Sequence, residues 1–235
     1  MWRSLAYQLL PRRCVVCELQ PGAASTSICT QCEADFFATA AARCERCAIG
    51  LPAGGFSTPR ICGRCLSNVP HFDATTTLAD YVSPVDGMVL ALKFTARLDL
   101  ARFFGQLLAS RLSSASAPTN ESVVIPVPLA FERLRQRGFN QSHQIARAFA
   151  SAAGRRLVGD RLLRIRHTPP QQSLALAERR RNVRGAFAVE GSLSGQHVFV
   201  VDDVMTTGST LNEVARVLKQ AGAAHVHNLI VARTP

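Results

Sequence analysis

Residues 197–210 of this 235-residue chain read HVFVVDDVMTTGST. The stretch begins with a short apolar run typical of a buried strand, and two carboxylates, Asp202 and Asp203, follow that run. A Thr/Gly/Ser loop follows and leads into a helical pattern. Backbone amides of such a loop, with the helix N-terminus behind them, can surround a phosphate group. The stretch therefore predicts a ribose phosphate site on an α/β fold.

The parts of this stretch have distinct expected roles. Loop hydroxyl groups can donate to the phosphate, and the acidic pair can accept from ribose hydroxyls, directly or through Mg²⁺. The alternative interpretation is that the loop is only an N-cap turn and that the acidic pair is the solvated end of a strand. No Gly-x-x-x-x-Gly-Lys motif is present, which argues against an ordinary nucleotide triphosphatase. The residues predicted to bind the ribose phosphate and Mg²⁺ are Asp202, Asp203, Val204, Met205, Thr206, Thr207, Gly208, Ser209 and Thr210.

Strand-like and helix-like runs alternate in the chain beyond residue 65. Helices of this length between strands imply crossover connections and a mainly parallel sheet. A Ser/Ala/Pro run at 113–119 predicts a surface connection, and the first 13 residues predict a short amphipathic helix. The expected strands are 72–81, 122–127, 156–164, 186–190, 197–202 and 225–232, and the expected helices are 85–112, 140–153 and 210–221.

The first 65 residues hold all eight cysteines, and each belongs to a Cys-x-x-Cys pair. Two residues between paired cysteines form a tight turn that points both sulfurs at one ion, and zinc takes four such thiolates. A redox role is the alternative, but four tandem pairs without a thioredoxin-like context argue against it. We expect two structural zinc ions and favour consecutive pairs over a cross-braced arrangement. The predicted ligands are Cys14, Cys17, Cys29 and Cys32, then Cys44, Cys47, Cys62 and Cys65.

The chain is strongly basic, with 27 Lys and Arg against 16 Asp and Glu and a formal net charge of +11. Nine arginines lie between residues 155 and 184, where Asp160 and Glu178 are the only acidic residues. A solvated face usually carries both signs, so this cluster favours a polyanionic partner, either nucleic acid or a polyphosphate ligand. The alternative is an arginine bias that follows from genome composition.

The apolar content of 47% is ordinary for a chain that buries a core. The uncharged apolar stretches, such as 123–127 and 198–201, are much shorter than the ~20 residues that span a bilayer. The N-terminus lacks the continuous apolar region of a signal peptide. We therefore expect no membrane insertion and a cytoplasmic protein, in which cysteines are more often metal ligands than disulfides.

The stretch 198–210 resembles the phosphoribosyl pyrophosphate (PRPP) signature of type I phosphoribosyltransferases, and nearly the whole chain resembles the ComF family (ComFC/GntX-like). This resemblance implies an α/β type I phosphoribosyltransferase fold at 67–235 after an N-terminal double zinc ribbon at 1–66. The motifs that carry it are the Cys-x-x-Cys module, LKF at 92–94, IPVPL at 125–129, Arg133, RGFNQ at 137–141 and the segment 172–187.

The resemblance also implies the rest of the PRPP site. A pyrophosphate loop follows the strand 122–127, and a mobile loop at 167–184 closes over PRPP with arginines that neutralise a diphosphate leaving group. Thr206 stands where some purine phosphoribosyltransferases have a general-base Asp, so base abstraction from a purine is not expected. The residues implied are Pro126, Val127, Pro128, Leu129, Arg133 and Arg137 in the pyrophosphate loop, and Gln172, Arg179, Arg180, Asn182 and Arg184 in the mobile loop.

Three functions compete at this point. The ComF family is associated with competence and the use of imported DNA, which implies a PRPP-binding protein that handles imported single-stranded DNA in the cytosol. The second is an active phosphoribosyltransferase that releases pyrophosphate from PRPP with an unidentified amine, base or nucleic acid acceptor. The third is a zinc-held adaptor with a degenerate site, which the complete phosphate loop argues against. The zinc module could also dock an uptake helicase or another competence protein.

Overall fold

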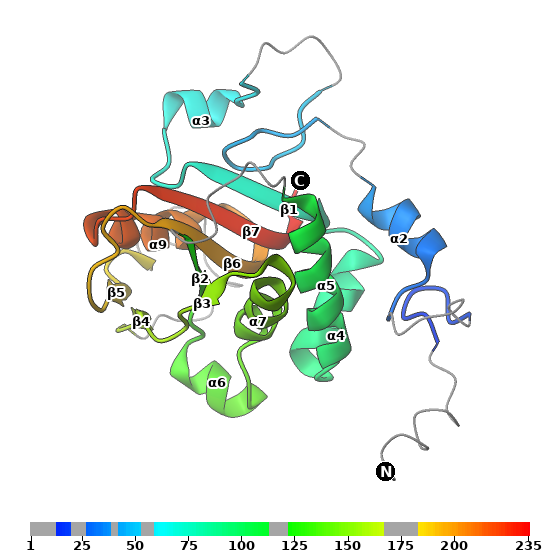
Figure 1. The fold of residues 1–235 in the computed structure, drawn as a ribbon. Helices are drawn as coiled ribbons and strands as arrows, with labels where there is room; N and C mark the ends of the chain where they lie inside the picture. The colour runs from blue at the N-terminus through cyan, green and yellow to red at the C-terminus, as the bar shows by residue number, and fades with distance from the viewer. Residues whose placement is uncertain (1–12, 20–26, 39–41, 53–58, 113–121, 167–182) are drawn as a thin grey trace.

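A computed structural model of the chain describes residues 13–19, 27–38, 42–52, 59–112, 122–166 and 183–235. A five-stranded parallel sheet runs through the molecule in the order β1-β7-β6-β2-β3 (Figure 1). A separate antiparallel pair is formed by β4 and β5. The parallel sheet confirms the predicted α/β class. The strands are β1 Ala74–Asp80, β2 Ser122–Pro126, β3 Arg156–Leu157, β4 Leu162–Arg164, β5 Phe187–Val189, β6 His197–Met205 and β7 His225–Arg233.

Helices cover both faces of the parallel sheet (Figure 1). The helices α4 (Val85–Phe94), α5 (Leu98–Arg111) and α7 (Gln141–Ala153) cover one face, and α9 (Ser209–Gln220) covers the other. Side chains of β6 alternate between the two resulting cores, with Phe199 on the α5 and α7 side and Val198 on the α9 side. Burial on both faces explains why β6 is a continuous apolar run.

The two cysteine-rich segments join different cores. In the first segment, helix α2 (Thr30–Phe37) ends in a fully buried Phe37, whose ring lies 5.5 Å from that of Phe103 and 6.2 Å from that of Phe104 on α5. The second segment, which contains α3 (Gly63–Ser67), contributes three of its cysteines to the core beneath α9. Each segment is therefore too small for a core of its own and is packed against one face of the α/β domain.

The expected single helix at 85–112 is wrong, because the structure breaks it into α4 and α5. Thr95 ends α4 and donates its hydroxyl to the carbonyl of Ala91 at 2.8 Å. Ala96 then takes a left-handed conformation with φ of 52°. Arg97, which pairs with Asp99 at 2.8 Å, precedes α5. Neither Gly nor Pro marks the break, so the helical periodicity of the sequence conceals it.

The expected single strand at 156–164 is also wrong. β3 pairs with β2 in the parallel sheet, and after a turn at Gly159 and Asp160 the chain enters β4, which pairs with β5. The change of partner is a tertiary event that an apolar pattern does not reveal. Helix α6 (Phe131–Arg137) was not predicted, because it buries no residue and lacks an apolar stripe. The expected N-terminal helix and the 113–119 connection lie outside the described residues.

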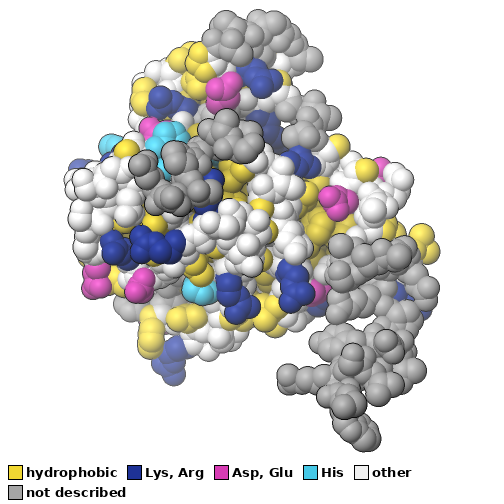
Figure 2. All heavy atoms as spheres, in the orientation of Figure 1, with side chains coloured by type: hydrophobic (Ala, Val, Ile, Leu, Met, Phe, Trp, Pro, Cys, Tyr) yellow, Lys and Arg dark blue, Asp and Glu magenta, His cyan; other side chains and the backbone are white. Residues whose placement is uncertain are grey.

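The arginines at 155–184 do not form one uniform surface. Arg155 lies 5.5 Å above the Phe199 ring, and Arg161 donates to the carbonyl of Ser192 at 2.8 Å, so both help to stabilise the fold. Figure 2 shows Lys and Arg side chains spread across the viewed face, with Asp and Glu side chains interspersed among them. No helix in the described ranges combines the length and apolar character that a membrane span requires.

Three histidines lie side by side on β6 and β7. His197 Nε2 is 3.1 Å from His225 Nδ1, and His227 Nε2 is 2.9 Å from the Thr76 hydroxyl. Burial, followed by the neighbouring His225, lowers the pKa of His197 to about 4. Burial, followed by His197, lowers the pKa of His227 to about 3. The folded protein therefore keeps these rings neutral.

This cluster predicts that stability declines in mild acid. Below about pH 6.5 these histidines bind protons in the unfolded chain but stay neutral in the folded protein. The free energy of unfolding therefore falls as the pH drops towards about 4. Since His227 retains some solvent contact, we expect it to contribute about 1 kcal/mol of the loss between about pH 7 and 5. Urea titrations of the wild type and His227→Gln at both pH values measure this. An identical loss in the variant would exclude His227 as the cause.

Candidate functional site

The predicted phosphate loop, residues 206–210, makes a sharp turn between β6 and α9. β6 ends at Met205 and α9 begins at Ser209, and Gly208 between them has a φ of 78°. The Thr207 hydroxyl lies 2.8 Å from the Ser209 hydroxyl and accepts from the Ser209 amide at 3.3 Å. The sharp turn thus gathers hydroxyl groups at the N-terminus of a 12-residue helix, where backbone amides and the helix dipole favour an anion.

Gly208 is favoured by its left-handed backbone conformation, whereas the close contact with Met205 involves the movable end of a flexible side chain. A Cβ there would lie 2.5 Å from Met205 Cε, in a conformation that strains residues other than glycine. We expect Gly208→Ala to weaken PRPP binding about tenfold, because small displacements of positioning groups are costly. Gly195→Ala is the control, since Gly195 has a φ of 71° but open space around it. Calorimetric titration of both variants with PRPP measures the effect. Equal affinities in the two variants would argue against a specific requirement for glycine at position 208.

The acidic pair lies near the carboxyl end of β6, just before this loop. Asp202 Oδ1 accepts from the Ser142 hydroxyl at 2.9 Å and from the Asp203 amide at 2.9 Å. Asp203 is 5% exposed, and its Oδ2 lies 3.2 Å from Lys93 Nζ. Burial, and then the charge of Asp203, raises the pKa of Asp202 to about 7. The pair is thus a compact anionic centre matched by one lysine.

Sequence reasoning gave no role to Ser142 or Lys93. Ser142 is placed by the start of α7, where the Asn140 side chain accepts from its amide at 3.0 Å and donates to the Val127 carbonyl at 3.0 Å. The Asn N-cap was a visible signal for this position. Lys93, at the end of α4, comes within reach of Asp203 only through the packing of α4 beside the sheet, which no local pattern shows.

The predicted pyrophosphate loop connects β2 to α6. The Val127 amide donates to the Val201 carbonyl at 2.9 Å, which ties the start of the loop to β6 beside the acidic pair. Pro126 and Val127 are buried, whereas Pro128 and Leu129 are partly exposed. The structure therefore brings this loop to the same sheet edge as the phosphate loop, where residues at the carboxyl ends of parallel strands can act together.

The two arginines predicted with that loop differ in environment. Arg133 is exposed, whereas the guanidinium of Arg137 lies 5.4 Å above the Phe94 ring and donates to Gln141. Burial lowers the pKa of Arg137, and the negative charge of Asp203 opposes this shift. A guanidinium held near the acidic pair suits bidentate contact with a diphosphate.

Of the predicted mobile-loop residues, Gln172, Arg179, Arg180 and Asn182 lie outside the described part of the chain. Arg184 is exposed, and the Gly185 amide after it donates to Glu213 Oε1 on α9 at 2.7 Å. Arg184 also lines a cavity of about 570 Å³ together with residues 207–209 of the phosphate loop. The segment at the end of the predicted mobile loop is thereby held next to the predicted phosphate loop.

The second cysteine-rich segment forms the opposite wall of this cavity. Arg64 on α3 donates to the Thr207 carbonyl at 2.7 Å, and the His71 amide donates to Asn212 Oδ1 on α9 at 2.7 Å. Both residues line the cavity. The cysteine module, which the sequence treats as a separate unit, therefore borders the phosphate loop directly.

The eight cysteines form two tetrads of consecutive pairs, as favoured from the sequence. In each tetrad the Sγ atoms all lie within 4.8 Å of one another. A residue with a left-handed conformation lies four positions after the first cysteine of each tetrad. These residues are Glu18, with a φ of 59°, and Ala48, with a φ of 56°. Amide groups support the sulfurs, for example from Cys29 to Cys14 Sγ at 3.4 Å. Four converging thiols on two tight turns fit structural zinc.

Comparisons with known proteins agree with this geometry. Residues 101–235 match the phosphoribosyl transferase domain family, and residues 5–66 match the double zinc ribbon domain family. A relative from Salmonella typhi, "DNA utilization protein YhgH", is 35% identical over 96% of this chain and 98% of its own length. The chain belongs to the ComF family. It therefore has a type I phosphoribosyltransferase fold with an N-terminal double zinc ribbon.

Two further ComF-family relatives carry names related to competence. "Competence protein F" from Haemophilus influenzae is 27% identical over 94% of this chain and 96% of its own length. "Competence protein ComFC" from Bacillus subtilis is 28% identical over 60% of this chain and 57% of its own length. The relatives from Salmonella typhi and Haemophilus influenzae match this chain almost end to end. The match therefore includes both the zinc module and the phosphoribosyltransferase domain of this ComF-family chain.

Proposed function

We propose that this ComF-family protein binds PRPP with Mg²⁺ at the β6–α9 loop and acts in the cytosolic handling of imported single-stranded DNA. The observation that carries the PRPP site is the acidic pair, Asp202 and Asp203, at the end of β6 directly before a hydroxyl-rich loop at the N-terminus of α9. Such a loop suits a terminal phosphate, and the two carboxylates at the end of the preceding strand suit ribose hydroxyls.

The charges around the acidic pair suit the rest of PRPP. Lys93 pairs with Asp203 at 3.2 Å, the charge of Asp203 acts on the guanidinium of Arg137, and the predicted pyrophosphate loop begins next to β6. In the proposed complex residues 206–210 would surround the 5′-phosphate. Asp202 and Asp203 would hold Mg²⁺, which would neutralise part of the diphosphate charge. Lys93 and Arg137 add fixed positive charge on the protein side.

The DNA part of the proposal is supported by charge and by relatives. The chain carries a formal charge of +11, and its relatives are named for DNA utilisation and competence. Neutralisation of phosphates by arginines makes affinity fall steeply with salt. Fluorescence anisotropy with a single-stranded oligonucleotide at low and high salt tests this. Affinity that is absent, or unchanged by salt, would contradict a role for phosphate neutralisation.

Turnover is the second candidate function, and it is supported by the arginines of the predicted pyrophosphate loop. In the proposed complex Arg133 and Arg137 would neutralise the charge that develops on a diphosphate leaving group. A purine acceptor is not favoured, because the loop carries Thr206 in place of a carboxylate base. An amine, another base or a nucleic acid remains as the acceptor of an active phosphoribosyltransferase.

One experiment separates the two functions. The zinc-replete protein is titrated calorimetrically with PRPP in the presence and absence of Mg²⁺, and the same sample is assayed for pyrophosphate release with and without single-stranded DNA. Binding without release supports a PRPP-dependent DNA-handling protein. Release that depends on DNA or on an added amine supports a transferase, and absence of PRPP binding contradicts both.

A further inference from the structure

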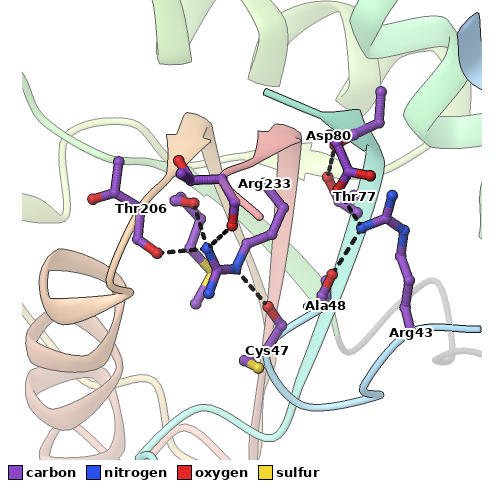
Figure 3. Close-up of polar contacts among 10 residues, drawn as sticks. Arg43, Cys47, Ala48, Thr77, Asp80, Thr206 and Arg233 are labelled. Carbon is purple, nitrogen blue, oxygen red and sulfur yellow. Dashed lines mark hydrogen bonds and ion pairs between the residues drawn. The ribbon is translucent and has the colours of Figure 1, made fainter. Parts of the chain in front are cut away.

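A buried arginine connects the second zinc ribbon to the phosphate loop. Arg233, the last residue of β7, is 3% exposed. Its Nε donates to the carbonyl of Cys47 at 3.1 Å (Figure 3). Its Nη1 lies 3.1 Å from the Met205 carbonyl and 2.6 Å from the Thr206 carbonyl. One guanidinium therefore joins the backbone of a zinc ligand to the backbone of the loop.

A second arginine extends this connection by one residue. Arg64, between two cysteines of the second tetrad, donates to the Thr207 carbonyl. Three successive carbonyls, those of residues 205, 206 and 207, are thus held by guanidinium groups. In a trans peptide the following N–H points away from the carbonyl. The amides of residues 206, 207 and 208 are consequently directed to the opposite side of the loop, as a phosphate site requires.

The contacts of Arg233 make the loop and the ribbon mutually dependent. A buried guanidinium is costly unless its donors find acceptors, and here the acceptors are carbonyls from both segments. If the knuckle at Cys47 moved, Arg233 would lose one acceptor and a fixed position. Its hold on the Met205 and Thr206 carbonyls would then weaken.

We propose that the second zinc ribbon holds the phosphate loop in its binding conformation, with Arg233 as the positioning residue. This inference rests on the proposed PRPP site. It requires that zinc binding at the second tetrad and PRPP binding strengthen each other, since coupling between two sites is reciprocal. The tetrad concerned is Cys44, Cys47, Cys62 and Cys65.

The same knuckle provides a matched control. Arg43 donates to the Ala48 carbonyl at 3.0 Å and pairs with Asp80 on β1 at 2.9 Å (Figure 3). Like Arg233, it links the knuckle to the sheet, but it does so from the knuckle side, through the carboxylate of Asp80. Unlike Arg233, its contacts with Ala48 and Asp80 do not reach the phosphate loop. Loss of Arg43 therefore tests attachment of the ribbon alone, and loss of Arg233 tests its connection to the loop.

The first test compares Arg233→Gln with Arg43→Gln. Both variants are checked for zinc content and circular dichroism and are then titrated with PRPP and Mg²⁺. We expect Arg233→Gln to bind PRPP at least about tenfold more weakly, since charge-assisted hydrogen bonds to the loop are lost. Arg43→Gln should stay within about twofold of the wild type. Equal affinities in the two variants would overturn the inference.

The second test uses the wild type and does not depend on a variant that folds. The partition of zinc between the protein and a chromogenic chelator is measured at equilibrium, with and without saturating PRPP and Mg²⁺. PRPP should tighten the binding of one of the two ions about tenfold and leave the other unchanged. Zinc affinities that PRPP does not alter would overturn the coupling, whereas a wild type that fails to bind PRPP at all would overturn the proposed function with it.

Discussion

Asp202→Asn should abolish most PRPP binding while leaving the protein at least as stable as before. The carboxylate is partly buried beside a second one, and this burial, followed by the charge of Asp203, raises its pKa to about 7. Between the unfolded value of 3.8 and about 7, the folded state binds more protons than the unfolded state. Stability therefore falls as the pH rises through that window. Asparagine removes this cost, so we expect unfolding at about pH 8 to require about 1 kcal/mol more.

The loss of binding has a separate cause. Asparagine retains a carbonyl oxygen for the Ser142 hydroxyl, but it removes the negative charge that would bind Mg²⁺ or accept from the ribose. We expect PRPP affinity to fall about a hundredfold, as in the loss of a charged hydrogen-bond partner. Calorimetric titration and urea unfolding measure the two effects on one preparation.

Asp86→Asn is the control, because Asp86 is partly exposed and accepts from the adjacent Gly87 amide on α4. Both its PRPP affinity and its stability should stay close to those of the wild type. If Asp202→Asn bound PRPP equally well, the acidic pair would be no more than a solvated strand end. If it were markedly less stable, the stated cost of the buried charge would be wrong.

Removal of zinc should unfold the ribbon segments and leave the parallel sheet in place. Thiolate coordination supplies roughly 10 kcal/mol of folding free energy in small zinc modules. The ribbons cannot replace this, since their few buried side chains are packed against the sheet domain. After treatment with a strong chelator, we expect hydrogen exchange at 13–67 to accelerate at least about a hundredfold. β6 and β7, buried on both faces, should keep their protection.

Single-cysteine variants test how the ligands are paired. With consecutive pairs, Cys14→Ser should lose one zinc and deprotect only the first ribbon, and Cys44→Ser should do the same for the second. A cross-braced arrangement would join the first and third Cys-x-x-Cys pairs, so Cys14→Ser would then deprotect residues 42–52 as well. Elemental analysis and mass-spectrometric hydrogen exchange distinguish these outcomes.

Short-range patterns were sufficient for much of the architecture. The two Cys-x-x-Cys pairs of each tetrad form ligands by local turns, and β6, its acidic pair and the loop before α9 are contiguous in the chain. Such features follow from residue spacing and from the two-sided burial of a parallel strand. They could therefore be predicted without knowledge of the fold. The break at Ala96 and the change of sheet after β3 could not, because each depends on which distant surface the segment meets.

The polar surroundings of the site were decided by the tertiary structure. Lys93 reaches Asp203, Ser142 reaches Asp202 and Arg233 reaches Cys47 across separations of 60 residues or more. No periodicity records such contacts, since they arise when helices pack on a sheet and align its carboxyl ends. Composition and spacing thus specify which groups can bind phosphate or zinc. The packing of the two ribbons against the sheet specifies which of these groups lie close together, because a buried charge is stable only where its partners converge.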